Sequence, residues 1–78
     1  MQQFPLFSTV ILTTNFPQFN FIKGDVATVV EYIEPQGYIL EIFDNQGDTI
    51  DVIPVLESDI ALPKPHAVVN YRDYASVA

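Results

Sequence analysis

Apolar and polar residues alternate with a period of two in four short stretches of this chain, a pattern that indicates β-strands whose two faces differ. The stretches are residues 8–14, 26–33, 38–43 and 49–53. Turn-forming residues separate the last three, namely Pro35-Gln36-Gly37 and the polar run 44–48. The pattern therefore predicts a meander of three strands joined by hairpins, preceded by one further strand.

The alternation also predicts which side chains share a face of the sheet. In the first strand, Val10 and Leu12 share one face of the sheet. In the second strand we expect one face to carry Val26, Thr28, Val30 and Tyr32. In the third strand the corresponding set is Tyr38, Leu40 and Ile42, and in the fourth Ile50 and Val52 lie opposite Asp51 and Ile53.

The connecting segments complete the expected fold. Residues 15–21 space three Phe around Pro17 and predict a long loop, because Pro donates no hydrogen bond to a sheet. Lys23-Gly24-Asp25 predicts a tight turn, and Pro54 is expected to end the fourth strand. Glu57-Ser58-Asp59 suits a single 3₁₀ turn. Residues 60–62 can then form a short fifth strand that pairs with the first and closes a barrel.

A chain of 78 residues forms one domain, which we place at residues 8–62 as an all-β, SH3-like five-stranded barrel. Residues 1–7 form an N-terminal extension and residues 63–78 an accessory C-terminal segment. The spacing of Val68, Tyr71 and Ala75 fits a helix as well as an extended segment, so its conformation stays open. With 49% hydrophobic residues, ten of them Phe or Tyr, and no cysteine, the core is expected to be rich in aromatic rings.

The net charge of −7 restricts the classes of partner. Only three basic residues oppose ten acidic ones, whereas binding to a phosphate backbone depends on Lys and Arg. The charge therefore argues against nucleic acid and favours a protein partner with a basic surface. We see no secretion signal and no apolar run long enough to span a membrane, so we expect a cytoplasmic protein.

Candidate catalytic and metal-binding groups are few. His66 is the only histidine, so a histidine metal cluster and a Ser-His-Asp arrangement are both excluded. The acidic turn at residues 44–48 is too short for an EF-hand, and its Asp and Asn residues suit a hairpin. Glu31 and Glu41 are expected to face solvent on neighbouring strands. We predict neither an enzyme nor a metal or cofactor site.

The chain resembles the bacterial domain-of-unknown-function family 4926 at four places. These are Val10-Ile11-Leu12, residues 22–31 with Lys23-Gly24-Asp25, residues 38–44 with Gly47-Asp48-Thr49, and residues 56–60. Family members typically carry Gly where this chain has Ala27, so the tightness of the turn rests on Gly24 here. The resemblance spans about residues 8–62, implies a small SH3-like bacterial protein that often stands alone, and supplies no catalytic residues.

Three functions follow as hypotheses. The first is a non-catalytic protein-protein interaction module that binds a basic or proline-containing partner, with an antitoxin or immunity protein as its specific version. The second is an accessory subunit of a larger complex, such as a complex of photosynthetic electron transport. At the level of fold, the chain distantly resembles the ferredoxin-docking subunit of cyanobacterial NDH complexes. The third is nucleic-acid binding like that of KOW domains, which the charge disfavours.

The candidate partner-binding residues are aromatic. Phe16, Phe19 and Phe21 in the long loop could turn outward beside Tyr32 or Tyr38 and form a groove of the kind that SH3 domains use for extended chains. The alternative is that all three Phe rings cap the core. The sequence alone leaves both arrangements open.

Overall fold

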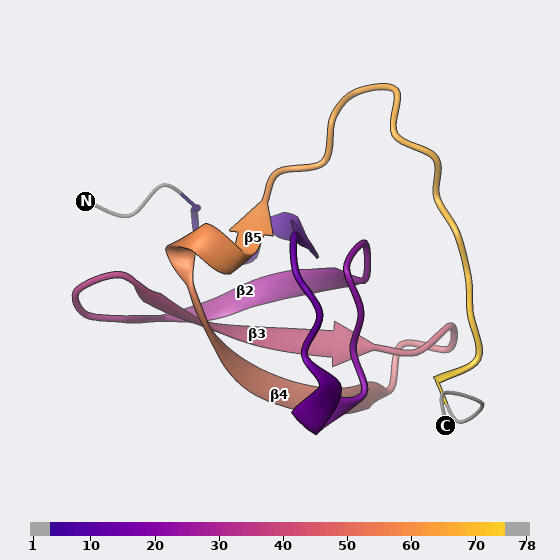
Figure 1. The fold of residues 1–78 in the computed structure, drawn as a ribbon, viewed down its shortest axis with the longest axis horizontal. Coiled ribbons are helices and arrows are strands. Elements are labelled where there is room, and N and C mark those ends of the chain that lie inside the picture. The colour runs from indigo at the N-terminus through magenta and orange to yellow at the C-terminus, as the bar shows by residue number, and fades with distance from the viewer. Residues whose placement is uncertain (1–3, 75–78) are drawn as a thin grey trace.

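Five β-strands form one antiparallel sheet in the computed structural model, which describes residues 4–74 (Figure 1). The strands are β1 (Thr9–Leu12), β2 (Val26–Ile33), β3 (Gly37–Phe43), β4 (Thr49–Leu56) and β5 (Ile60–Ala61). Two 3₁₀ turns, η1 (Pro17–Phe19) and η2 (Glu57–Asp59), lie between them. The order across the sheet is β4-β3-β2-β1-β5. The predicted all-β fold, the meander and the pairing of the fifth strand with the first are confirmed, whereas closure into a barrel stays a prediction.

The buried face of the meander follows the alternation in β3, where Tyr38, Leu40 and Ile42 are all buried. In β2 the register with β3 shifts between Val29 and Glu31. This β-bulge adds one residue and changes the phase, so that Val29 is buried before it and Tyr32 packs against the core after it. The prediction that Tyr32 shares a face with Val26 was therefore wrong.

A second register shift lies between Ile42 and Phe43 of β3 and changes the phase of β4. Ile50 packs against the core, but Val52 is half exposed and Ile53 is buried. Our expectation that Ile50 and Val52 share a face was wrong for the same reason as in β2. Period-two counting cannot locate a bulge, because the extra residue leaves no compositional mark in these strands.

Pro54 does not end β4, which continues to Leu56. Pro54 lies opposite Ile39 in the pairing of β3 and β4. A proline is tolerated here because β4 is the last strand of the sheet, where a missing N–H group can face away from the ladder. The residues beyond Pro54 add buried Val55 to the core.

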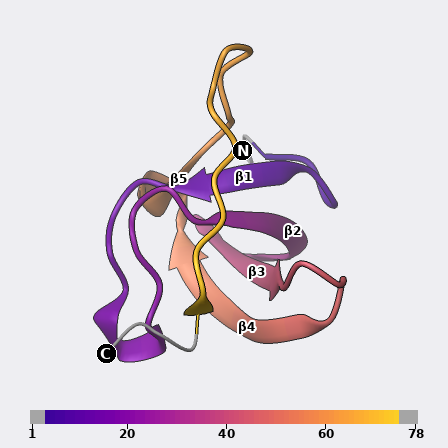
Figure 2. The same ribbon diagram turned by 90° about the vertical axis from the view of Figure 1, so that its right-hand side faces the viewer.

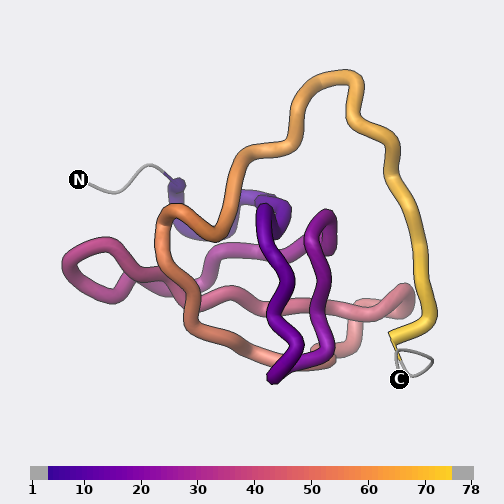
Figure 3. The backbone as a smooth tube through the Cα atoms, in the orientation of Figure 1, coloured from indigo at the N-terminus to yellow at the C-terminus, as the bar shows by residue number. Residues whose placement is uncertain are grey.

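The segment between β1 and β2 folds as a long hairpin that crosses one face of the sheet (Figure 3). Its two arms are joined by paired backbone hydrogen bonds between Phe16 and Phe21, at 2.8 and 3.1 Å. Asn20 turns the chain between them with a left-handed backbone, at φ 63°. Phe21 is buried, whereas Phe16 and Phe19 are half-buried and pack against the core. The aromatic loop is thus the cover of the core on this side.

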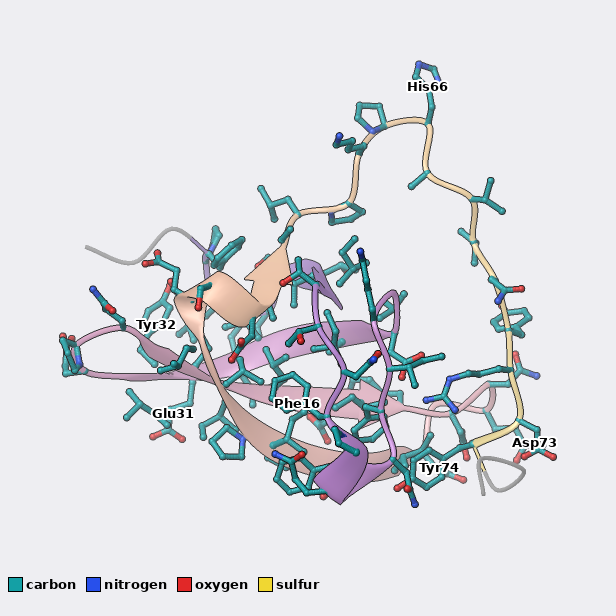
Figure 4. The ribbon with its side chains drawn as sticks, viewed as in Figure 1. Phe16, Glu31, Tyr32, His66, Asp73 and Tyr74 are labelled. Carbon is teal, nitrogen blue, oxygen red and sulfur yellow. The ribbon has the colours of Figure 1, made fainter. Side chains whose placement is uncertain are left out.

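The C-terminal segment leaves β5, arches away from the sheet and returns across its other end to the aromatic loop, where Arg72 and Tyr74 contact the carbonyls of Asn20 and Phe19 (Figures 1 and 2). Residues 62–73 contain no helix or strand, and a turn at residues 65 and 66 is closed by a hydrogen bond from the Ala67 N–H to the Lys64 carbonyl at 3.1 Å. His66 lies at the top of the arch (Figure 4). Ala75, on which the helical spacing depended, lies outside the described residues.

Candidate functional site: the cleft at Asp25

The turn formed by Lys23, Gly24 and Asp25 is held from three sides. Gly24 has a φ of 97°, a conformation that side chains with a Cβ rarely adopt, and its N–H donates to the Leu12 carbonyl at 2.8 Å. The Asp25 carboxylate accepts from the Ile22 N–H at 2.8 Å, and the Asn15 side-chain oxygen accepts from the Lys23 N–H at 2.8 Å. The turn therefore presents one fixed carboxylate, that of Asp25, at the end of the sheet.

Arg72 from the C-terminal segment binds this carboxylate. Its Nε donates to Asp25 Oδ1 at 2.9 Å and its Nη2 to Asp25 Oδ2 at 2.5 Å, which is the two-pronged geometry that a planar guanidinium favours. Nη2 also donates to the Asn20 carbonyl at 3.1 Å. The hydrogen bond to Asp25 raises the pKa of the Arg72 guanidinium and outweighs its partial burial, which acts in the opposite direction. Arg72 is therefore a permanent cation in this contact.

Tyr74 makes the second contact of the segment. Its hydroxyl donates to the Phe19 carbonyl at 3.0 Å, and its ring lies 5.2 Å from that of Phe21, centroid to centroid, at an interplanar angle of 34°. The hydroxyl thus contacts the tip of the aromatic loop, and the ring contacts its second arm. Tyr74 is half-buried and joins the partly buried residues around the core.

A cleft separates the C-terminal segment from the sheet above these two contacts. It is lined on one side by residues 68–74 and on the other by residues 21–28, residues 42–45 and Ile50. We call this space the Asp25 cleft. Three residues of the segment that lie along it are strongly exposed: Val68 by 91%, Val69 by 78% and Tyr71 by 80%. The segment is therefore held mainly at Arg72 and Tyr74.

The aromatic residues predicted as a binding groove lie in two separate groups. In the loop, the ring centroids of Phe16 and Phe19 are 6.4 Å apart and the rings are tilted against each other. The rings of Tyr32 and Tyr38 meet edge-on, with their centroids 5.7 Å apart. Phe16 and Tyr32 lie well apart in Figure 4. Phe21 and Tyr38 are each only 1% exposed, so these two rings belong to the core and offer no surface to a partner. Phe16, Phe19 and Tyr32 keep part of their surface accessible.

The remaining polar candidates do not converge. Glu31 lies opposite Ile39 and Glu41 opposite Thr28, so the two carboxylates are not cross-strand partners. In the acidic turn the Asp44 carboxylate accepts from the backbone N–H groups of Gln46 and Asp48, at 2.8 and 2.9 Å. Across residues 4–74, no group of three or more His, Asp or Glu side chains could hold a metal ion. Within the same residues, no helix has the length and apolar character needed to cross a membrane.

Sequence reasoning missed three residues that matter here. Arg72 and Tyr74 were assigned only to an accessory segment, although Arg72 is one of just three basic residues and faces an excess of acidic groups. Phe4, in the predicted N-terminal extension, is buried and meets Tyr38 edge-on at 5.4 Å. An isolated residue near a terminus has no periodic neighbours. The scarcity of basic residues could have marked Arg72, whereas nothing in the composition marked Phe4, which is one of six Phe.

The fold and the cleft together define a small all-β protein with one antiparallel sheet and a docked C-terminal segment. Its chain belongs to the family described as Domain of unknown function (DUF4926), whose model matches residues 6–62. Asp25 lies inside the matched region, and Arg72 and Tyr74 lie outside it. No curated protein and no solved structure matches the chain.

Proposed function

We propose that this protein is a non-catalytic module that binds another protein, and that the partner presents a basic, extended segment to the Asp25 cleft. One observation carries the proposal. An arginine-bearing segment from outside the family region of the same chain already binds Asp25 and forms one wall of the cleft. The facing wall, which carries Asp25, thus has the geometry needed to hold such a segment.

The charge of the chain supports a basic partner. The net charge is −7, and among the residues that line the cleft Asp25, Asp44 and Asp73 outnumber the basic residues Lys23 and Arg72. A surface of this sign attracts cationic segments and speeds their encounter. The same charge opposes contact with nucleic acid.

The tip of the aromatic loop, which lies beside the cleft, also suits recognition of an extended segment. Backbone carbonyls at Phe19 and Asn20 point toward the C-terminal segment and accept hydrogen bonds from it. Half-buried Phe19 adds apolar surface beside them. A carboxylate, carbonyl acceptors and aromatic rings in one place are the parts that bind a peptide with alternating cationic and apolar side chains.

The experiment is affinity purification of the tagged full-length protein from an extract of its own cells, comparing Asn45→Lys with Gln36→Lys. Both changes replace an exposed amide by Lys. Asn45 lines the cleft, whereas Gln36 lies in the turn between β2 and β3 at the opposite end of the sheet (Figure 1). We expect a stoichiometric partner with the wild-type protein and with Gln36→Lys, and loss of that partner with Asn45→Lys.

The added Lys repels a basic segment only at the cleft, so the two variants separate a local effect from a change in total charge. Equal recovery with both variants would contradict the proposed site. Absence of any stoichiometric partner with the wild-type protein would contradict the proposed function. Circular dichroism of both variants checks that each remains folded.

A further inference from the structure

We propose that three residues, Asp51, Pro54 and Asp59, close the free edge of β4 to strand addition and so keep a second copy of this chain from extending the sheet. We call them the edge-blocking residues. Each of them removes or occupies one backbone N–H group on the side of β4 that has no neighbouring strand. The inference goes beyond the proposed function and does not rest on it, because the Asp25 cleft is lined by other residues.

The free edge of β4 has the composition of a strand that associates with other strands. Among the described residues β4 is the last strand on its side of the sheet, and it is eight residues long. Its apolar residues Val52 and Leu56 are 50% and 59% exposed. A long edge strand with exposed apolar side chains is a template for pairing with another chain. The opposite edge, β5, is only two residues long and offers little to pair with.

The pairing of β3 with β4 determines which N–H groups of β4 point to the free edge. In an antiparallel ladder, residue pairs that exchange hydrogen bonds alternate with pairs whose N–H and C=O groups point away from each other. Pro54 has no N–H group and lies opposite Ile39, which suits a pair of the second kind. Val52 and Leu56 are two residues before and after Pro54 in the same register. Their N–H groups therefore also point to the free edge.

Side-chain carboxylates occupy both of these N–H groups. The Val52 N–H donates to Asp51 Oδ1 at 2.8 Å, and the Leu56 N–H donates to Asp59 Oδ2 at 2.9 Å. An N–H group that is already bonded within its own chain can donate to an incoming strand only after that hydrogen bond breaks. Because Pro54 lies between the two, the free edge from Val52 to Leu56 presents no unpaired N–H group.

The edge-blocking residues oppose a second copy in two ways. Antiparallel strands bond through reciprocal N–H and C=O groups, so an edge without free donors leaves the acceptors of an incoming strand unpaired. The second copy also carries the same carboxylates on its own β4, and like charges that face each other across a strand pair are destabilising. The free edge of β4 is therefore closed to an identical edge through lost hydrogen bonds and through repulsion.

The test compares two double variants of the full-length protein by size-exclusion chromatography with light scattering. The β4 variant, Asp51→Ala with Pro54→Val, frees the N–H group of Val52 and restores one at position 54. The control variant, Asp48→Ala with Pro65→Val, makes the same changes in charge and composition at exposed positions outside β4. Between about 10 μM and 1 mM, the mean mass of the β4 variant should rise about twofold or more, whereas the wild-type protein and the control should keep the mass of one chain.

A folded β4 variant that keeps the mass of one chain would overturn the proposal, and so would a wild-type protein that associates through β4. If the β4 variant is recovered only as an aggregate, Pro54→Val alone decides in the same assay. It keeps both carboxylate contacts, and Val is favoured in strands. Pro54→Val should associate at lower concentration than Pro65→Val, and equal behaviour of these two single variants would overturn the proposal.

Amide hydrogen exchange then locates the contact between the copies. Association of the β4 variant should slow exchange at residues 52–56 by about tenfold or more and leave residues 22–28, which line the Asp25 cleft, unchanged. Slower exchange at the cleft without a change at residues 52–56 would place the second copy elsewhere and overturn the proposal. The proposed function is tested by Asn45→Lys at the cleft, so either idea can fail while the other stands.

Discussion

The guanidinium of Arg72 binds the carboxylate of Asp25 through two nitrogens, across 47 residues of sequence. The two side chains are 23% and 16% exposed, so water screens the pair only in part. Asp25 also holds the turn that begins β2 through the Ile22 N–H. One carboxylate thus connects the turn most characteristic of the family resemblance to a segment outside the family region.

Replacing Arg72 by Ala should lower the free energy of unfolding by about 1 kcal/mol, the value expected of a partly exposed charge pair with good geometry. Arg72→Lys should restore less than half of that loss, because Lys keeps the charge but cannot contact both carboxylate oxygens in the same way. Urea denaturation measures both values. Full recovery in Arg72→Lys would show that charge alone, without the two-pronged geometry, holds the segment.

Removal of the Tyr74 hydroxyl should also be measurable. Tyr74→Phe loses the hydrogen bond to the Phe19 carbonyl and should destabilise the protein by about 0.5–1.5 kcal/mol. Tyr71→Phe is the matched control, because Tyr71 is 80% exposed and its loss of a hydroxyl should change stability by less than about 0.5 kcal/mol. Equal effects at the two positions would contradict the docking of Tyr74.

Phe21 tests whether the aromatic loop covers the core. Phe21→Ala should cost about 3–5 kcal/mol, because the ring is fully buried and its removal leaves a cavity. Phe7→Ala removes the same ring from a residue that is 73% exposed and should cost less than about 1 kcal/mol. Thermal unfolding of the two variants would show the difference, and a mild effect at Phe21 would place its ring at the surface.

Gly24→Ala should destabilise the protein by about 1–2 kcal/mol, because a Cβ is strained at a φ of 97° even though space is available around it. Gly24→Asn should lose less, since Asn tolerates positive φ better than other residues do. Chemical denaturation of the pair gives the comparison. If Ala and Asn had the same effect, the cost would come from something other than backbone strain.

The sequence predicted the strands well where the alternation is uninterrupted. β3 and the hairpins on either side of it were located correctly because Tyr38, Leu40 and Ile42 follow the pleat without a break. Faces were predicted wrongly beyond Val29 in β2 and at Ile50 in β4, since each strand contains a register shift. The prediction that Pro54 ends β4 was wrong because an edge strand tolerates a proline. Whether β4 is an edge strand depends on the order of the strands in the sheet.

The candidate site was predicted only in part. The aromatic loop was recognised from its three Phe residues, but the sequence could not say that Phe21 is buried whereas Phe16 is only half-buried. The contact of Arg72 with Asp25 has no local signal at all, because it joins distant residues through the path of the whole chain. Long-range pairs of this kind follow from tertiary structure and not from spacing.

The docking of Arg72 on Asp25 is tested most directly by ¹⁵N relaxation of the Arg72 Nε–H group and backbone amide in the full-length protein, with and without Asp25→Asn. We predict an ordered Arg72 in the wild-type protein, with a backbone order parameter approaching that of rigid structure at about 0.85, and a fall below about 0.6 in the variant. A mobile Arg72 in the wild-type protein, or an ordered one that is indifferent to Asp25→Asn, would contradict the account.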